Sequence, residues 1–195
     1  MLRAGVIGLG DMGSGLAKNL IKNGIATTGL DLSDERMSAF VEMSGTPAGS
    51  VAELGTNSDA VFVMVMNGVQ AKAVILGDDG LAAHMPKGGA IILTATIKPS
   101  EARDIGTALE GSGIHLIDSP VSGGFPGAQG GTLTMMAAAT SEVLDQYKPI
   151  MGAVSKTIHR VGTRAGDGQV MKSCLQTLIG SIFGATFEAA ALAAK

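Results

Sequence analysis

Short apolar runs punctuated by glycine alternate along this chain with longer amphipathic stretches. The short runs predict buried strands, and the amphipathic stretches predict helices that cover them. We expect strands near Ala4–Gly8, Thr27–Asp31, Ala60–Val65, Ala90–Leu93, Ile114–Asp118, Leu133–Ala138 and Thr157–Arg160. We expect helices near Met12–Lys22, Asp34–Met43, Val69–Leu76, Pro99–Glu110 and Ser141–Met151. This alternation predicts a doubly wound α/β fold, with a mostly parallel sheet and helices on both faces.

The last 30 residues have a different pattern. From Gly166 to Lys195 there is no proline, the spacing is helical, and Glu188 is the only charge between Lys172 and Lys195. The length and the sequence Gly180-Ser181-Ile182-Phe183-Gly184 leave a membrane-spanning helix open as an alternative. The polar residues of this segment and its alanine-rich end favour a helix covered by protein instead. We therefore expect it to lead into an all-helical domain absent from this chain, or to pack on a partner.

Composition narrows the function classes. Of 195 residues 29 are glycine, about twice the usual ~7%, and no tripeptide repeat orders them. The chain has five Phe, one Tyr and no Trp, which argues against nucleic-acid binding by base stacking. Fourteen basic and 17 acidic residues give a net charge of −3 without a basic stripe, so we expect no nucleic-acid partner.

The cysteine count and the first residues predict a compartment. Cys174 is the only cysteine, so no internal disulfide forms, as is typical of a reducing cytosol. The chain runs from Met1 directly into the first apolar run, without the pattern of a signal peptide. We expect a cytoplasmic protein that has no membrane partner.

A glycine loop follows the first expected strand. Gly8-Leu9-Gly10-Asp11-Met12-Gly13 matches G-x-G-x-x-G, and a helix follows it. Gly8 permits a tight turn, Gly10 lets the backbone approach a pyrophosphate, and Gly13 lets the helix lie close to the strand. The amides at the helix start would then bind the anion. A packing turn without a ligand is the alternative, but the context predicts a Rossmann-type dinucleotide site.

The acid expected to accompany such a loop is Asp31, which ends the second strand 18 residues after Gly13. A carboxylate at this place accepts hydrogen bonds from the adenosine ribose hydroxyls and repels a 2′-phosphate, which favours NAD over NADP. Arg36 follows five residues later and leaves some use of NADP open. A helix N-cap or turn is the other interpretation of Asp31. We assign residues 1–163 to an NAD-binding domain and residues 164–195 to the start of an interdomain helix.

A second glycine cluster, Asp118 to Gly131, follows the strand near Ile114. Ligands of open α/β sheets bind beyond the carboxyl ends of the strands, where this cluster lies. The amides of Gly123 and Gly124, with the Ser122 hydroxyl, form a candidate nest for a carboxylate. An ordinary surface loop is the alternative.

Lys172 is the candidate for proton transfer. Its neighbours Val170, Met171 and Cys174 are apolar, and a desolvated lysine has a lowered pKa and can exchange a proton with an alcohol oxygen. Gln176, one helical turn later, is a candidate hydrogen-bond partner for the substrate. The residues alone favour the other interpretation, a solvated helix lysine.

Other chemistries find no support in the sequence. The three histidines, His84, His115 and His159, are scattered without the spacing of a metal site, so we expect no metal. Neither G-x-S-x-G nor the Walker sequence occurs.

Three motifs in this order resemble the β-hydroxyacid dehydrogenases, the family of 3-hydroxyisobutyrate dehydrogenase and tartronate semialdehyde reductase. They are the glycine loop continued through Asn19-Leu20, the sequence Asp118-Ser119-Pro120-Val121-Ser122-Gly123-Gly124 continued to Leu133, and Gly166-x-Gly168-x-x-x-Lys172. The resemblance spans essentially the whole chain. It implies an oxidoreductase that transfers a hydride between NAD and the β-hydroxyl of a small 3-hydroxy acid.

The resemblance also implies roles for particular residues. Ser122, Gly123 and Gly124 would hold the substrate carboxylate, and Lys172 would be the general acid/base. Thr96 matches the position on the nicotinamide ribose side. Val65 and Met66 match positions that line the cofactor at the end of their strand.

This chain departs from the family at two points. The family carries asparagine three or four places after the lysine, where this chain has Leu175 and Gln176. The departure favours a different substrate, such as a sugar acid of the threonate type. Family members also continue into a helical domain that closes the cleft, through which we expect a homo-oligomer. A non-catalytic dinucleotide-binding or scaffolding module remains the main alternative, and an imine reductase is a third, although such relatives replace the lysine.

Overall fold

The computed structural model describes residues 2–194. Its strands join in a single sheet, in the order β3-β2-β1-β4-β5-β6-β8-β7, with β9 paired to β8. The strands are β1 (Ala4–Ile7), β2 (Thr27–Leu30), β3 (Thr46–Pro47), β4 (Ala60–Val63), β5 (Ala90–Leu93), β6 (His115–Asp118), β7 (Val121–Ser122), β8 (Leu133–Ala138) and β9 (Ser155–Gly162). The helices are α1 (Asp11–Lys22), α2 (Asp34–Glu42), α3 (Val51–Thr56), α4 (Gly68–Leu76), α5 (Leu81–His84), α6 (Pro99–Ala108), α7 (Gly124–Gly130), α8 (Ser141–Val154) and α9 (Asp167–Ala193).

The sheet is mostly parallel, as the sequence predicts. The pairs from β3 to β6 are all parallel, whereas β8 runs antiparallel to β6 and to β7. The chain first builds outward from β1 to β2 and β3, then returns to place β4 on the other side of β1. This reversal between β1 and β4 creates the switch point at which open α/β sheets bind ligands.

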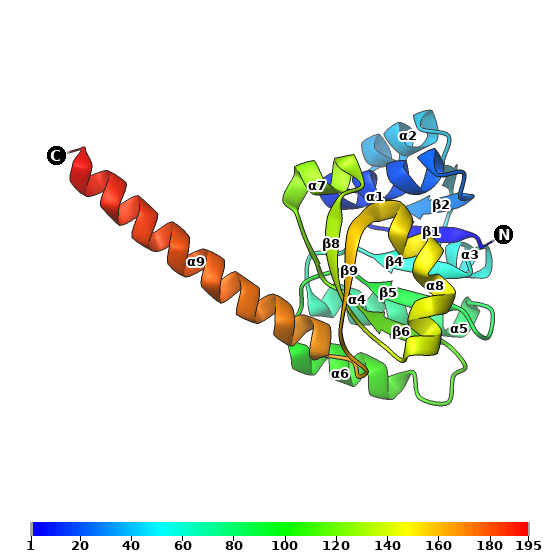
Figure 1. Ribbon diagram of the computed structural model, residues 1–195. Coiled ribbons are helices and arrows are strands. Elements are labelled where there is room, and N and C mark those ends of the chain that lie inside the picture. Colours follow the sequence, from blue (N-terminus) through cyan, green and yellow to red (C-terminus); the bar gives the residue numbers. More distant parts are fainter. Residues whose placement is uncertain (1, 195) are drawn as a thin grey trace.

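Two hydrophobic cores lie on opposite faces of the sheet. Within β4, Ala60 and Phe62 belong to one core and Val61 and Val63 to the other, because successive side chains of a strand point to opposite faces. Helices α1, α2, α7 and α8 cover the first face, and α3 to α6 cover the second (Figure 1). The buried strands read as continuous apolar runs because both faces are covered.

The predicted strands and helices are present with small shifts at their ends, and five short elements were not predicted from the sequence: β3, α3, α5, β7 and α7. The most consequential of them is α7, which lies in the glycine cluster expected to be an irregular loop. Glycine disfavours helix, but tertiary packing overrides that preference here. A side chain at Gly15 of α1 would lie 2.6 Å from the backbone of Ala128 in α7, so the two helices are in backbone contact.

The last helix, α9, projects from the domain as a rod of 27 residues (Figure 1). Only Gly168, Gln169 and Lys172 near its start are buried. Most of its large apolar side chains are exposed within residues 2–194, among them Val170, Met171, Leu178, Ile182, Phe183, Phe187 and Leu192, whereas Leu175 and Ile179 are partly buried. Among the described helices, α9 alone is long and apolar enough to cross a membrane, with a mean hydropathy of 1.3 over an 18-residue window. Core helices of soluble proteins also meet these two criteria. That a further helical domain or a partner protein covers α9 stays a prediction.

Candidate functional site

The glycine loop between β1 and α1 has the geometry that its motif predicts. Gly8 adopts φ +89°, and a side chain at this position would collide with the Met64 carbonyl. A side chain at Gly13 would collide with the Gly8 carbonyl, so only glycine lets α1 start this close to the loop. Gly10 is the N-cap of α1 and supplies no side-chain acceptor. The first amides of α1 are therefore available to an anion.

Asp31 follows β2 and faces the same loop. Its side chain is 8% exposed, and its Oδ2 accepts a hydrogen bond of 2.7 Å from the Leu9 amide. Its Oδ1 accepts from the Ser33 amide at 2.9 Å, and Nη1 of Arg36 lies 3.5 Å from each carboxylate oxygen. The N-cap of α2 is Ser33, so the N-cap interpretation of Asp31 is wrong. Asp31 both closes a turn and binds the glycine loop.

The other expected cofactor residues leave the sheet at the same edge. Ile7 of β1, Val63 of β4 and Leu93 of β5 are paired in register, so the segments that follow them start side by side. Val65 and Met66 lie in the first residues after β4, and Thr96 lies after β5. Met66 is 84% exposed and Thr96 is also exposed. The structure thus brings these residues to the edge where Gly8 begins the dinucleotide loop.

Ser122, Gly123 and Gly124 form a continuous turn from β7 into α7. Gly123 and Gly124 have successive positive φ angles of +128° and +58°. Such a turn lets neighbouring backbone N–H groups converge, which suits it to a carboxylate. The three residues are half-buried or exposed, so a ligand could reach them.

Helices α1 and α7 connect the two glycine segments. The Asn19 side chain of α1 is buried, and its Nδ2 donates to the Gly15 carbonyl at 2.8 Å and to the Ala128 carbonyl at 2.9 Å. Gln129 of α7 donates from Nε2 to the Asp11 carbonyl at 3.3 Å. The nest at Gly123–Gly124 is therefore fixed relative to the dinucleotide loop.

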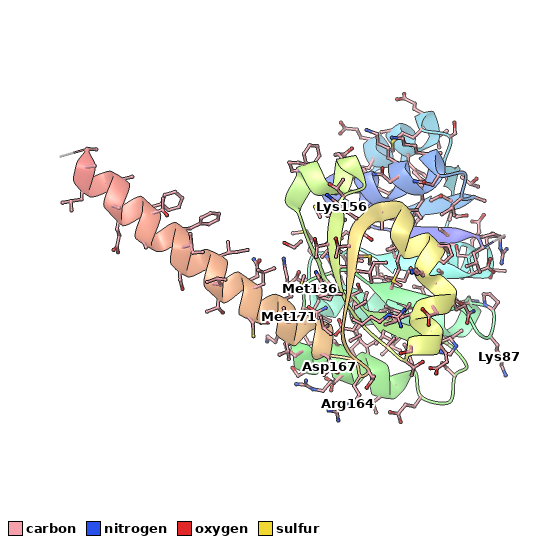
Figure 2. All side chains as sticks on the ribbon, viewed as in Figure 1. Lys87, Met136, Lys156, Arg164, Asp167 and Met171 are labelled. Carbon is pink, nitrogen blue, oxygen red and sulfur yellow. The ribbon has the colours of Figure 1, made fainter. Side chains whose placement is uncertain are left out.

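The start of α9 packs against β6 and β8. A side chain at Gly168 would lie 2.6 Å from the Asp118 and Met136 carbonyls, so only glycine fits there. Figure 2 shows α9 leaving the domain beside Met136, with Asp167 at its first turn. Burial raises the pKa of the Asp118 carboxyl, and hydrogen bonds from Gln169 and Gly166 partly oppose that shift.

Lys172 is buried on this helix, with 9% of its surface exposed. Burial lowers the pKa of its ammonium. Among residues 2–194, no hydrogen bond or ion pair satisfies its Nζ. The solvated lysine that the residues alone favour is therefore wrong, because the first turns of α9 lie against the sheet.

Gln176 is exposed one turn beyond Lys172, and no hydrogen bond within the described residues joins it to the nest. Leu175 is partly buried instead. Sequence reasoning missed Gln169, which is 1% exposed and contacts Asp118. Its signal was a polar residue three places before Lys172, on the same helix face.

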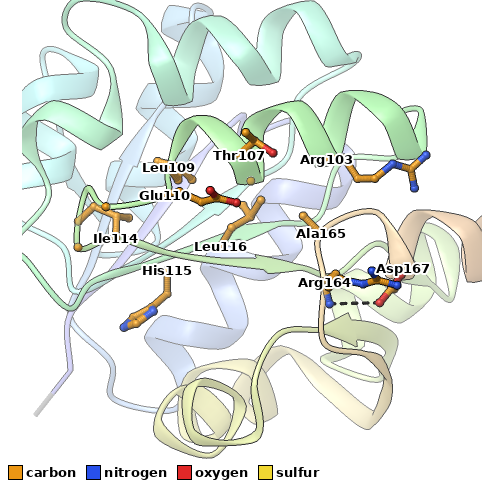
Figure 3. A pocket seen from close by; sticks show the side chains of 13 residues that line it. Arg103, Thr107, Leu109, Glu110, Ile114, His115, Leu116, Arg164, Ala165 and Asp167 are labelled. Atoms are coloured by element: carbon orange, nitrogen blue, oxygen red, sulfur yellow. Dashed lines mark hydrogen bonds between the residues drawn. The ribbon is translucent and has the colours of Figure 1, made fainter.

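A groove of about 930 Å³ beside α6 is separate from these residues (Figure 3). Arg103 and Thr107 of α6, Leu116 of β6, and Arg164 and Asp167 before and in α9 contribute to its lining. It contains none of the residues predicted to bind cofactor or substrate. Within residues 2–194 no group of three His, Cys, Asp or Glu side chains could hold a metal ion.

Comparison with known proteins gives consistent matches. The family model described as the NAD binding domain of 6-phosphogluconate dehydrogenase matches residues 3–162. L-threonate dehydrogenase of Escherichia coli O6:H1 is 35% identical over 192 residues, which cover 98% of this chain and 64% of the relative. An NAD-dependent L-serine dehydrogenase of Pseudomonas aeruginosa is also 35% identical, with the same coverage.

The solved structures agree with these matches. The crystal structure of 3-hydroxyisobutyrate dehydrogenase from Salmonella typhimurium superposes with a TM-score of 0.92 at 32% identity. That match covers 100% of this chain and 68% of the other. The chain spans about 64% of the length of the curated relatives named above.

Proposed function

This chain belongs to the β-hydroxyacid dehydrogenase family, and from that premise we propose that it transfers a hydride between NAD and the β-hydroxyl of a small 3-hydroxy acid. One observation carries the proposal beyond family membership. Lys172 is buried without a partner on the helix that starts beside Asp118, the first residue of the second glycine motif. Most of this side chain is buried although Nζ is not itself fully enclosed, and the partial desolvation disfavours the charged amine, which favours a functional reason for its position.

The residues at the sheet edge fit a dinucleotide. The positive φ of Gly8 and the lack of side chains at Gly10 and Gly13 leave the loop backbone open to a pyrophosphate. Asp31 lies where a carboxylate selects ribose hydroxyls, which supports NAD over NADP. Bound NAD supplies the hydride acceptor, and the chain supplies its binding and orientation.

Lys172 would handle the proton of the reaction. In the oxidation direction the β-carbon loses a hydride with its electron pair, and the neutral amine of Lys172 takes the hydroxyl proton as the carbonyl forms. In the reduction direction its ammonium returns that proton to the carbonyl oxygen. The lowered pKa brings the amine closer to working pH, where general acid–base catalysis is most efficient.

The nest at Gly123–Gly124 supports a carboxylic acid as substrate. Its backbone amides, with the Ser122 hydroxyl, would bind the carboxylate and orient the hydroxyl toward Lys172. The relatives are named for threonate, serine and 3-hydroxyisobutyrate, which are all small acids that carry a hydroxyl group. Leu175 and Gln176 in place of asparagine favour a sugar acid of the threonate type. A homo-oligomer belongs to the same proposal.

The test is NAD reduction with L-threonate, L-serine, glycerate and 3-hydroxyisobutyrate at alkaline pH. We expect Lys172→Ala to lower kcat about 10²- to 10⁴-fold, the usual contribution of a general acid or base. Lys148→Ala is the matched control, because Lys148 is exposed on α8. Undiminished turnover in Lys172→Ala would remove Lys172 from the proposed role.

The same measurements separate an enzyme from a binding module. Calorimetric titration with NAD reports cofactor binding without requiring turnover. NAD binding with no turnover on any of the four acids would favour the non-catalytic module. Turnover that depends on Lys172 would favour the dehydrogenase.

A further inference from the structure

The first turn of α9 is held by a carboxylate from another element. Asp118, at the end of β6, is fully buried. Its Oδ2 accepts hydrogen bonds from the Gly166 amide at 2.8 Å and from the Gln169 amide at 3.2 Å. These are amides that the helix itself leaves without acceptors. Asp118 therefore fixes where α9 begins.

The side chain of Gln169 extends this contact to a third segment. Its Nε2 donates to Oδ1 of Asp118 at 2.9 Å and to the Ala95 carbonyl at 3.0 Å. Its Oε1 accepts from the Ile97 amide at 3.0 Å. Both N–H groups and the oxygen of this amide are thus used in a buried site.

These bonds enclose the residue between Ala95 and Ile97. That residue is Thr96, which is exposed at the sheet edge while its two neighbours are buried. Lys172 lies three residues after Gln169, on the same face of α9. One carboxamide therefore joins the segment that carries Thr96 to the helix that carries Lys172.

The chemistry of the pair requires an amide at residue 169. The group must donate to a carboxylate and a carbonyl while it accepts from a backbone amide. A carboxylate at this position would face both Asp118 and the Ala95 carbonyl without a proton to donate. An apolar side chain would leave the Ile97 amide buried and unpaired, which costs about 1–3 kcal/mol.

We propose that Gln169, oriented by Asp118, is a positioning residue that sets the placement of Lys172 relative to Thr96 at the edge of the sheet. The proposal rests on the proposed function, because Thr96 and Lys172 have their roles only in that reaction. Gln169 touches neither substrate nor cofactor and acts through the two segments it joins. A displacement of about 1 Å in such a site can lower the rate about 10²-fold.

The test exchanges the two functional groups. Gln169→Glu and Asp118→Asn each leave the pair without matched donors and acceptors, whereas the double variant places the amide at 118 and the carboxylate at 169. In the double variant the introduced amide donates to the introduced carboxylate, and its oxygen still accepts from the Gly166 amide. The Ala95 carbonyl loses its donor and faces the introduced carboxylate, so the recovery is incomplete. We expect each single variant to lower kcat at least tenfold and the double variant to recover at least half of that loss on a logarithmic scale.

A destabilised fold would predict a different pattern from a positioning role. A positioning role lowers kcat much more than it weakens NAD binding, since the glycine loop and Asp31, which make the other expected NAD contacts, form no hydrogen bond to the exchanged pair. Circular dichroism confirms that each variant is folded. Single variants that keep wild-type kcat, or a folded double variant no better than the worse single one, would overturn the proposal.

A second readout does not depend on turnover. The acylation rate of Lys172 against pH, measured by competitive labelling and mass spectrometry, gives the pKa of its amine. We expect that pKa to rise toward 10.5 in each single variant and to return in the double variant, with Lys148 unchanged as internal reference. A Lys172 pKa that does not move overturns the positioning role even if the enzyme is active. If the pKa moves and returns but wild type turns over none of the acids, Gln169 still sets the surroundings of the Lys172 amine, and it is the proposed reaction that fails.

Discussion

The backbone amide of Leu9 donates a hydrogen bond of 2.7 Å to the carboxylate of Asp31, which joins the glycine loop to the end of β2. The residue expected to select the cofactor ribose therefore also shapes the loop expected to bind the pyrophosphate. A hydrogen bond to a charged group contributes about 1.5–3 kcal/mol. Loss of this carboxylate should affect both parts of the dinucleotide site.

Replacement of Asp31 should weaken NAD binding more than NADP binding. We expect Asp31→Ala to raise the Kd for NAD about tenfold or more. The lost hydrogen bond to the charged group contributes about 1.5–3 kcal/mol, and each tenfold in Kd corresponds to about 1.4 kcal/mol. The Kd for NADP should rise less, because the variant also removes a negative charge that repels the 2′-phosphate. Calorimetric titration measures both values. The control is Asp34→Ala, at an exposed position in the first turn of α2. An equal rise of the Kd for NAD and for NADP in Asp31→Ala would contradict the assignment of Asp31 as the residue that selects NAD.

Two glycine-to-alanine changes in helices should have opposite effects. At Gly13 an added methyl group would collide with the Gly8 carbonyl, so Gly13→Ala should destabilise the fold by about 1–3 kcal/mol and abolish NAD binding. At Gly152 of α8 nothing lies within 4 Å of an added methyl group. Gly152→Ala should stabilise the protein by about 0.5–1 kcal/mol, since alanine is the better helix former. Urea unfolding followed by circular dichroism measures both, and a neutral Gly13→Ala would show that the loop can move.

The partly desolvated ammonium of Lys172 should cost stability at neutral pH. Because its pKa is lowered in the folded state, the unfolded chain binds more protons between that lowered pKa and 10.5, so stability rises with pH over this window. Below the window the folded protein bears the whole desolvation cost, and above it none.

We therefore expect Lys172→Met to unfold at higher urea concentration than wild type at pH 7. The difference should shrink as the pH rises toward 10.5. Lys148→Met, at an exposed position, should show no such dependence. A Lys172→Met protein that is less stable than wild type at pH 7 would mean that the ammonium has a stabilising partner.

The ion pair between Arg3 and Asp59 should stabilise the edge of the sheet where β1 and β4 begin. Nη2 of Arg3 lies 2.8 Å from Oδ1 of Asp59, and the hydrogen bond from Arg3 lowers the pKa of that carboxyl below 3.8. A lowered carboxyl pKa gives stability that is present above pH 3.8 and is lost as the pH falls through the folded-state value.

Asp59→Asn should lower the free energy of unfolding at pH 7 by about 1 kcal/mol or less, because both side chains are partly exposed. The difference from wild type should vanish in acid, as measured by urea unfolding between pH 2 and 7. Asp104→Asn, at an exposed position on α6, is the control. A deficit that persists at pH 2 would show that the pair acts through packing rather than charge.

The dinucleotide half of the site could be predicted from local sequence. The strand before Gly8, the helix after Gly13 and the acid at the end of β2 are neighbours along the chain, and each follows from backbone sterics or strand pattern. Helix α7 in the second glycine cluster was not predicted, because glycine disfavours helix and the packing of this segment on α1 and β8 arises only in the folded protein.

The sequence by itself determined the alternation of strands and helices, the places where only glycine fits, and the order of the three motifs, because these depend on residues close together in the chain. Tertiary structure alone decided that Lys172 is buried and that Gln169 bridges Asp118 to the residues beside Thr96. Those contacts join positions 51 and 72 residues apart. Burial and hydrogen-bond geometry depend on which elements pack together, and no local pattern of residues encodes that.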